Sequence, residues 1–232
     1  MNPEIQVLSA GAVKTGLRAV ADEFTKRGQG SVALTFATAP AIKAQVLDGC
    51  VADVVAAPPA AMDEFAKAGK IDASALAMLG RVGAGVAVRA GAPLPDISSV
   101  EALKGALLNA DSIAFNKAST GNYLEGLFER LGLSAALASK IARQDNGAGV
   151  LEHLLRSHGR DIGFGAVTEI IVFKDKGVRL VGPLPAEIQN YTSYAAAPMT
   201  STRNIEAARA FVAFLGGSEG KAILGACGIE PA

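Results

Sequence analysis

Short apolar runs alternate with amphipathic segments along almost the whole chain, and this alternation constrains the fold more than any other feature. Residues 5–9, 32–36 and 52–56 are apolar runs of strand length, whereas 15–26 has apolar residues at the spacing of a helix with one buried face. Such alternation is typical of a mixed, mostly parallel sheet with helices on both faces. The sequence therefore predicts an α/β fold.

The same reading of periodicity gives the remaining elements. Further helices are expected at 41–48, 62–68, 100–107, 123–131, 150–157, 205–215 and 219–227, and further strands at 82–88, 112–115, 161–165, 177–181 and 194–198. The helices at the end of the chain need a sheet to cover, and the first part of the chain is the shorter one. We therefore expect two lobes, 1–83 plus 195–232 as lobe 1 and 84–194 as lobe 2, with two hinge crossings near 84 and 194 and a cleft between the lobes.

Charge and hydropathy exclude several classes of partner. The 232 residues carry 22 basic and 22 acidic side chains without any Lys/Arg run, which disfavours nucleic acid and acidic membrane surfaces. No apolar stretch reaches the roughly 18 residues that span a bilayer, so no membrane insertion is expected. The start MNPEIQVLSAG lacks the basic and long apolar regions of a signal peptide, which points to the cytoplasm, although a mature form without its leader would look the same.

Metal and cofactor signals are weak. Cys50 and Cys227 fit neither a metal cluster nor a disulfide framework, and we expect two buried free thiols. His153 and His158 are expected on one helix ending near Gly159, but five residues apart they do not share the face that a zinc pair needs. The glycines of LGRVGAGVAVRAG lead into a strand, not from a strand into a helix, so they do not indicate a dinucleotide site.

Small-residue turns follow the expected strands, and such carboxyl ends are where parallel sheets bind ligands. The stretch 111–134 is the clearest case, with a strand at 112–115, a loop at 116–121 and a helix thereafter. Ser119 and Thr120 stand where an N-cap belongs, and Gly121 allows close backbone approach. A helix start of this kind favours an anion, although a plain cap without a ligand is the alternative.

Several segments together resemble the periplasmic solute-binding proteins of the molybdate-binding type. They are VLSAGAVKTGLRAVADEF, NKASTGNYLEGLFERLGL, DIGFGAVTEI and the tail from YTSYAAAPMTSTRNIEAARAF to the C-terminus. The resemblance implies a type II periplasmic-binding-protein-like fold whose lobes close on a small anion, with no metal, no cofactor and no covalent chemistry. It also implies a periplasmic location and a membrane transporter of the ABC class as partner.

The resemblance also supplies the site. In that family a serine after the first strand binds the oxyanion, and here the matching residue is Ala12, while a second serine falls at Thr38 or Ala39. Lost hydroxyl donors argue against molybdate, and Lys14, Lys43 and Lys117 suit an organic di- or tricarboxylate. The predicted ligand-binding residues are Ser9, Gly11, Ala12, Lys14, Thr38, Ala39, Lys117, Ser119, Thr120, Gly121, Asn146, Thr168 and Tyr194.

An enzyme is the alternative, because the same structural family resembles aconitate isomerase, which moves the double bond of a tricarboxylate. Such chemistry needs a base within hydrogen-bond reach of an acidic C–H. Lys14, Lys117, Glu169 and Tyr194 could each serve, and no spacing singles one out. The sequence has no Ser-His-Asp pattern and no nucleophile elbow, so binding without catalysis is favoured. A structural or interaction module is disfavoured because there are no repeats.

Overall fold

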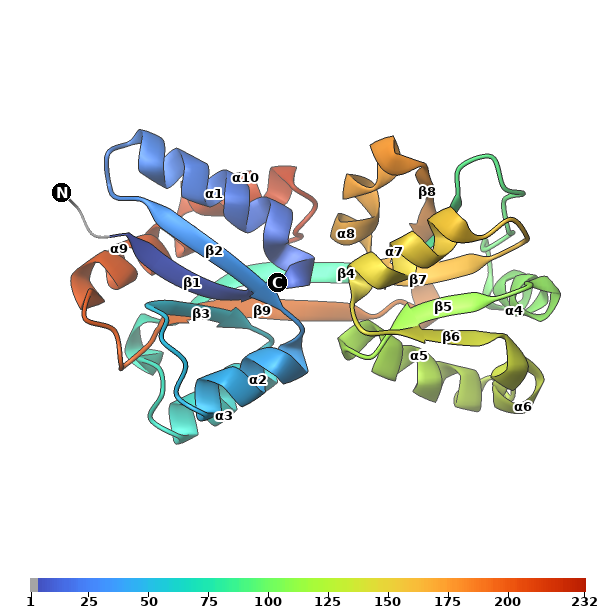
Figure 1. The fold of residues 1–232 in the computed structure, drawn as a ribbon, viewed down its shortest axis with the longest axis horizontal. Helices are drawn as coiled ribbons and strands as arrows, with labels where there is room; N and C mark the ends of the chain where they lie inside the picture. The colour runs from blue at the N-terminus through green and yellow to red at the C-terminus, as the bar shows by residue number, and fades with distance from the viewer. Residues whose placement is uncertain (1–3) are drawn as a thin grey trace. The chain divides into compact units, whose positions relative to one another are not determined.

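The computed structural model describes residues 4–232, and the chain forms two compact units (Figure 1). Unit 1 extends as far as Val82 and resumes with Ser193–Ala232, and unit 2 is Gly83–Thr192. The strands β4 (Ala77–Arg89) and β9 (Tyr191–Pro198) contain the two boundaries, so each strand supplies residues to both units.

Unit 1 is a mixed sheet with helices on both faces. Its strands are β1 (Ile5–Ala10), β2 (Val32–Ala37), β3 (Val54–Ala57) and β9, and its helices are α1 (Lys14–Lys26), α2 (Ala39–Leu47), α3 (Pro59–Lys67), α9 (Ile205–Gly216) and α10 (Ser218–Ala226). The order is β2-β1-β3-β9, with β1 parallel to both neighbours and β9 antiparallel to β3. Helices α1, α9 and α10 contact one another, while α2 and α3 form a second pair.

Helix α1 illustrates how the sequence makes this packing. Its expected apolar face is confirmed, since Leu17, Val20 and Phe24 are fully buried. Removing such a side chain from water contributes about 1.5–3 kcal/mol each. The ring of Phe24 meets that of Phe211 in α9 edge to face, with centroids 5.2 Å apart. A side chain at Gly16 would lie 2.6 Å from Ile229, so this glycine is what allows the C-terminal segment to pack against α1.

Unit 2 has the same kind of architecture. Its strands are β4, β5 (Ile113–Asn116), β6 (Ile141–Gln144), β7 (Ile162–Ala166) and β8 (Val178–Pro183), and its helices are α4 (Val100–Asn109), α5 (Ser119–Arg130), α6 (Ser134–Leu137), α7 (Gly147–Arg156) and α8 (Val167–Val172). The order is β4-β7-β5-β6, with β5 parallel to β6 and β7, and with β7 and β8 both antiparallel to β4.

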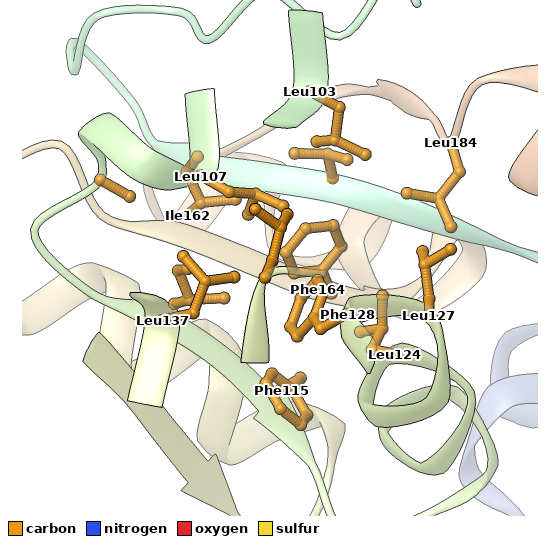
Figure 2. Packing of buried hydrophobic residues seen from close by; sticks show 14 of the residues in the cluster. Leu103, Leu107, Phe115, Leu124, Leu127, Phe128, Leu137, Ile162, Phe164 and Leu184 are labelled. Carbon is orange, nitrogen blue, oxygen red and sulfur yellow. The ribbon is translucent and has the colours of Figure 1, made fainter. Parts of the chain in front are cut away.

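Three phenylalanine rings form the centre of the core of unit 2. Phe128 lies between Phe115 and Phe164, at centroid distances of 5.9 and 6.3 Å, and both pairs are edge to face. Leucines of α4 and α5 surround these rings, including Leu103 and Leu124 (Figure 2). A smaller cluster on α7 and α8 covers the other face of the sheet. This core fixes the positions of the carboxyl ends of β5, β6 and β7. The predicted ligand residues of unit 2 follow directly after these ends.

The α/β class is confirmed, but several local predictions are corrected. The strand β6 was not predicted, because only two of its four residues, IARQ, are apolar. It is an edge strand of unit 2, and all four of its residues are half-buried. Helices α2, α3, α5 and α7 begin two to four residues earlier than their apolar periodicity indicated, since the first turn of a helix need not contribute to the buried face. Because α7 ends at Arg156, His158 lies outside the helix that carries His153.

The two cysteines are free, as expected, but they are half-buried and not fully buried. Partial burial still raises the pKa of both thiols, because desolvation disfavours the thiolate. Within residues 4–232, no helix combines the length and apolar character needed to cross a membrane.

Candidate functional site

In unit 1, six predicted ligand residues lie at or just after the neighbouring ends of two parallel strands: Ser9, Gly11, Ala12, Lys14, Thr38 and Ala39. Ala10 is the last residue of β1 and pairs with Ala37, the last residue of β2. The chain then turns directly into a helix in both cases: a short 3-10 turn, Gly11–Val13, leads into α1, and Thr38 leads into α2. The starts of two helices therefore lie at the same end of the sheet, and helix starts favour anions in general, although Lys14 N donates to the Gly11 carbonyl and Pro40 in the first turn of α2 has no N–H.

The hydroxyl groups at this edge behave differently. Ser9 is fully buried, and its Oγ donates to the carbonyl of Ala10 at 3.2 Å, so its proton is used inside β1. Thr38 is the N-cap residue of α2, with extended backbone, but its side chain makes no capping hydrogen bond. Ala12 supplies no hydroxyl at all. Thr38 is therefore the side-chain donor that this edge offers to a ligand.

The three lysines expected near the turns also differ. Lys43 Nζ is 2.6 Å from a carboxylate oxygen of Glu64, and Lys117 Nζ is 2.8 Å from Asp145 Oδ1 in unit 2. Lys14 forms no ion pair with any residue of 4–232, and its Nζ lies 5.4 Å from the ring centroid of Phe36. Lys14 is thus the lysine whose charge is not already balanced by a carboxylate.

Tyr194 lies in the middle of a further strand that contributes to unit 1. It belongs to β9, where the next residue, Ala195, pairs with Ala57 at the carboxyl end of β3. The side chain is 6% exposed. The residue after Tyr194 thus lies beside the carboxyl end of β3, which α3 follows directly.

In unit 2, helices α5, α7 and α8 begin at one edge of the sheet. Asn116, the last residue of β5, pairs with Gln144, the last residue of β6, and Lys117 N donates to the Gln144 carbonyl at 2.9 Å. Ser119, Thr120 and Gly121 are the first three residues of α5. The structure thus places Lys117 beside the first turn of α5, as the sequence predicted from the order of the residues.

The prediction that Ser119 or Thr120 caps α5 is wrong. The N-cap residue is Ala118, which has extended backbone and no side chain able to cap. Asn116, 6% exposed, performs this role from the preceding strand: its Oδ1 accepts from Ala118 N at 3.0 Å and from Gly121 N at 3.3 Å. The helix begins earlier than expected, so both hydroxyl residues have helical backbone and neither is needed as a cap.

Gly121 does permit a close approach, but the approaching group is the chain itself. A Cβ at this position would lie 1.7 Å from the carbonyl oxygen of Asn116. The backbone of Gly121 does not have a positive φ, so glycine is not required here for a left-handed conformation. The need for glycine here is therefore the packing of α5 on the end of β5.

The starts of α7 and α8 contain the remaining predicted residues. Asn146 is the N-cap of α7, as expected, and its Oδ1 accepts from Gly149 N at 2.9 Å. Thr168 is the second residue of α8 and is 4% exposed. A Cβ at Gly147 would be 2.1 Å from the Glu169 carboxylate, so this carboxylate lies against the first turn of α7. The Glu169 carboxylate therefore occupies the position in front of the start of α7 at which a bound anion would be favoured.

One polar cluster was missed by the sequence reading. Ser112 Oγ lies 2.9 Å from His153 Nε2 and also donates to Asp161. The serine, not the histidine, is in the middle, so the arrangement differs from a hydrolytic triad. Ser112 directly precedes β5 and Asp161 directly precedes β7. The cluster therefore lies at the amino-terminal ends of these strands, whereas the helix starts lie at their carboxyl ends. In the described part of the chain, no three His, Cys, Asp or Glu side chains are placed to hold a metal ion.

Comparison with known proteins assigns the chain to a family. The family model of bacterial extracellular solute-binding proteins matches residues 5–230. The chain belongs to this family. An aconitate isomerase from Pseudomonas sp. is 30% identical over 235 residues, covering 98% of this chain and 87% of the relative.

Solved structures agree on the fold. The periplasmic molybdate-binding protein of Azotobacter vinelandii superposes with a TM-score of 0.79 at 19% identity and 97% coverage of both chains. PEB3 of Campylobacter jejuni with bound L-phospholactate gives a TM-score of 0.74 at 15% identity, covering 98% of this chain and 100% of PEB3. This solute-binding protein thus has the type II periplasmic-binding-protein-like fold that the resemblance implied.

Proposed function

We propose that this solute-binding protein binds a small organic di- or tricarboxylate in preference to molybdate, at the carboxyl ends of its parallel strands. The observation that carries the proposal is the pairing of Ala10 with Ala37, which brings the starts of α1 and α2 together at one sheet edge. Backbone N–H groups there can bind a carboxylate oxygen as readily as an inorganic oxyanion. The ligand residues proposed from the sequence begin at this edge and at the corresponding edge of unit 2.

The preference for carboxylate rests on a missing hydroxyl donor and an available positive charge at the carboxyl ends of β1 and β2. A buried tetrahedral oxyanion loses about 1.5–3 kcal/mol for each charge-assisted donor that is missing, and Ala12 supplies none. Lys14, without an acidic partner in the described chain, offers a positive charge instead. The 30% identity with an aconitate isomerase, whose name states a tricarboxylate substrate, supports the same ligand class.

A thermal-shift panel tests this proposal. It would contain molybdate, sulfate, phosphate, citrate, cis- and trans-aconitate, and short dicarboxylates. A ligand present at 100 times its dissociation constant stabilises the folded protein by about 2.7 kcal/mol, which is a clear shift. We expect carboxylates to give the largest shifts. Molybdate giving the largest shift at micromolar concentration would overturn the preference.

An isomerase is the second candidate, and the identity with aconitate isomerase is what favours it. Of the possible bases, Lys117 is ion-paired with Asp145, and the Glu169 carboxylate lies against the start of α7. Lys14, which forms no ion pair within residues 4–232, is then the first side chain to substitute, and Tyr194 is substituted as the remaining candidate named from the sequence. Incubation with cis- or trans-aconitate, followed by NMR, separates the two functions. Turnover that is lost in Lys14→Met or Tyr194→Phe would establish catalysis, whereas binding without turnover would support a binder of that ligand.

The family also implies a partner. We propose that the protein delivers its solute to a membrane transporter of the ABC class, as the family of extracellular solute-binding proteins suggests. Uptake of the best ligand of the panel, measured in cells with and without the gene for this protein, tests the partnership. Equal uptake in both would contradict it.

A further inference from the structure

Two cations and one aromatic ring form an unassigned cluster on α1 and β2. Lys14 and Arg18 lie one helical turn apart, at i and i+4, and therefore project from the same side of α1. Both reach the ring of Phe36, with the Lys14 Nζ 5.4 Å and the Arg18 Cζ 5.6 Å from its centroid. These distances are within the range of cation–π attraction, so the ring holds two positive groups side by side.

The two cations of the cluster form no ion pair, although Asp22 stands one further turn along α1 from Arg18. Neither Lys14 nor Arg18 forms an ion pair with any residue in the described part of the chain, while Arg27, the C-cap residue of α1, pairs with Glu23 at 3.0 Å. Two like charges at i and i+4 repel each other and destabilise a helix by a few tenths of a kcal/mol. A bound anion would remove this repulsion, so the arrangement is one that an anionic group completes.

The cluster also lies next to the turns of the proposed function. Phe36 pairs with Ser9, one residue before β1 and β2 end. Lys14 follows the 3-10 turn Gly11–Val13 without a break. The two cations are therefore positioned beside the backbone N–H groups at which the first anionic group of a ligand is proposed to bind.

We propose that Lys14, Arg18 and Phe36 form a second subsite, which binds a further carboxylate of a polyanionic ligand and selects di- and tricarboxylates over monoanions. This inference rests on the proposed function. Arg18 presents a planar fork of N–H donors that matches the two oxygens of a carboxylate, and Lys14 adds a point charge. Phe36 fixes the two cations in place. A ligand with one small anionic group can engage the strand-end turns but does not reach this subsite.

The test compares matched variants by calorimetry with three probes: propane-1,2,3-tricarboxylate, glutarate and butyrate. We expect Lys14→Met and Arg18→Gln each to weaken tricarboxylate binding about tenfold, since each removes a charge-assisted hydrogen bond that is partly exposed. Butyrate binding should change less than twofold in Arg18→Gln, which leaves Lys14 in place. Lys26→Met is the control, because it removes the same charge from the last turn of α1, away from Phe36. It should leave all three affinities within twofold.

Two additional measurements make the result specific. Arg18→Lys keeps the charge but loses the planar fork, so it should lose part of the affinity that Arg18→Gln loses. The tricarboxylate advantage of the wild type should also shrink between 0.05 and 0.5 M NaCl, because exposed charges are screened. Circular dichroism and urea titration would verify that each variant is folded.

The outcomes separate this inference from the proposed function. If the wild type binds none of the anions tested, the proposed function fails and the subsite with it. If the wild type binds tricarboxylates and Arg18→Gln and Lys14→Met bind them equally well, the subsite is overturned while the proposed function stands. Equal wild-type affinity for butyrate and the tricarboxylate would also overturn it.

Discussion

At the residue scale, Asn116 has the capping role that the sequence suggested for Ser119 or Thr120. Asn116 is buried and accepts two hydrogen bonds from the first turn of α5, whereas Ser119 makes no capping bond. We expect Asn116→Ala to lower the free energy of unfolding by about 1–2 kcal/mol, because it leaves buried N–H groups without their acceptor. Ser119→Ala should lower it by less than about 0.5 kcal/mol. Urea titration measures both.

Ser119 can still be a ligand residue, and the same variant tests this separately. If its hydroxyl donates to a bound carboxylate, Ser119→Ala should weaken binding by about 1.5–3 kcal/mol while stability is almost unchanged. Calorimetry with the best ligand of the anion panel gives the affinity. Unchanged affinity together with unchanged stability would mean that Ser119 is only a surface residue of the helix start.

At the scale of the element, the position of α5 depends on one glycine. A methyl group at Gly121 would overlap the Asn116 carbonyl, at 1.7 Å, so the helix would have to move away from β5. We expect Gly121→Ala to cost about 3 kcal/mol of stability, because backbone atoms cannot shift as a flexible side chain can. The cost should appear as a lower urea midpoint with an unchanged slope.

Gly126 on the same helix is the matched control. The nearest atom to a methyl group there is the end of the Arg130 side chain, at 3.4 Å, which can rotate away. Gly126→Ala should therefore stabilise the protein by about 0.5–1 kcal/mol through helix propensity. If both substitutions had the same effect, the close approach of α5 to β5 would not be what requires Gly121.

At the scale of the whole molecule, three carboxylates with lowered pKa make the free energy of unfolding depend on pH in the acid range. The pKa of Asp72 is lowered by a hydrogen bond from Ser74 and then by Arg209, that of Asp111 by the Arg160 backbone N–H, and that of Asp145 by Lys117. A carboxylate with a lowered folded pKa binds a proton less readily in the folded than in the unfolded chain. Its contribution is present above the unfolded pKa of about 4 and is lost as the pH falls through the folded value.

We therefore expect the urea midpoint to be constant between pH 7 and 5 and to fall steadily below about pH 4. The step should be small, since Asp111 and Asp145 are exposed and solvent screens them, while Asp72 is only half-buried. Asp72→Asn should lower the midpoint at pH 7 and flatten the acid limb, whereas Asp63→Asn, at an exposed position whose side chain makes no hydrogen bond or ion pair within residues 4–232, should do neither. A midpoint that rises on acidification would contradict this account.

The sequence by itself determined the α/β class, most helices and strands, and the edge of each sheet at which small-residue turns gather. These features depend on periodicity and on turn residues, which are properties of neighbouring positions in the chain. Ser99 and Asn146 as caps of α4 and α7 were predictable for the same reason.

Only the tertiary structure decided which polar groups remain available. Lys43 pairs with Glu64, 21 positions away, and Lys117 pairs with Asp145, 28 positions away. The packing of separate elements therefore balances the charges of these two lysines, which local sequence alone leaves available to a ligand. Packing also gave the capping role at α5 to Asn116 and brought Arg18, which no local pattern singled out, to Phe36 beside Lys14. Such pairings depend on where the sheet places distant residues, and a periodic pattern carries no information on that.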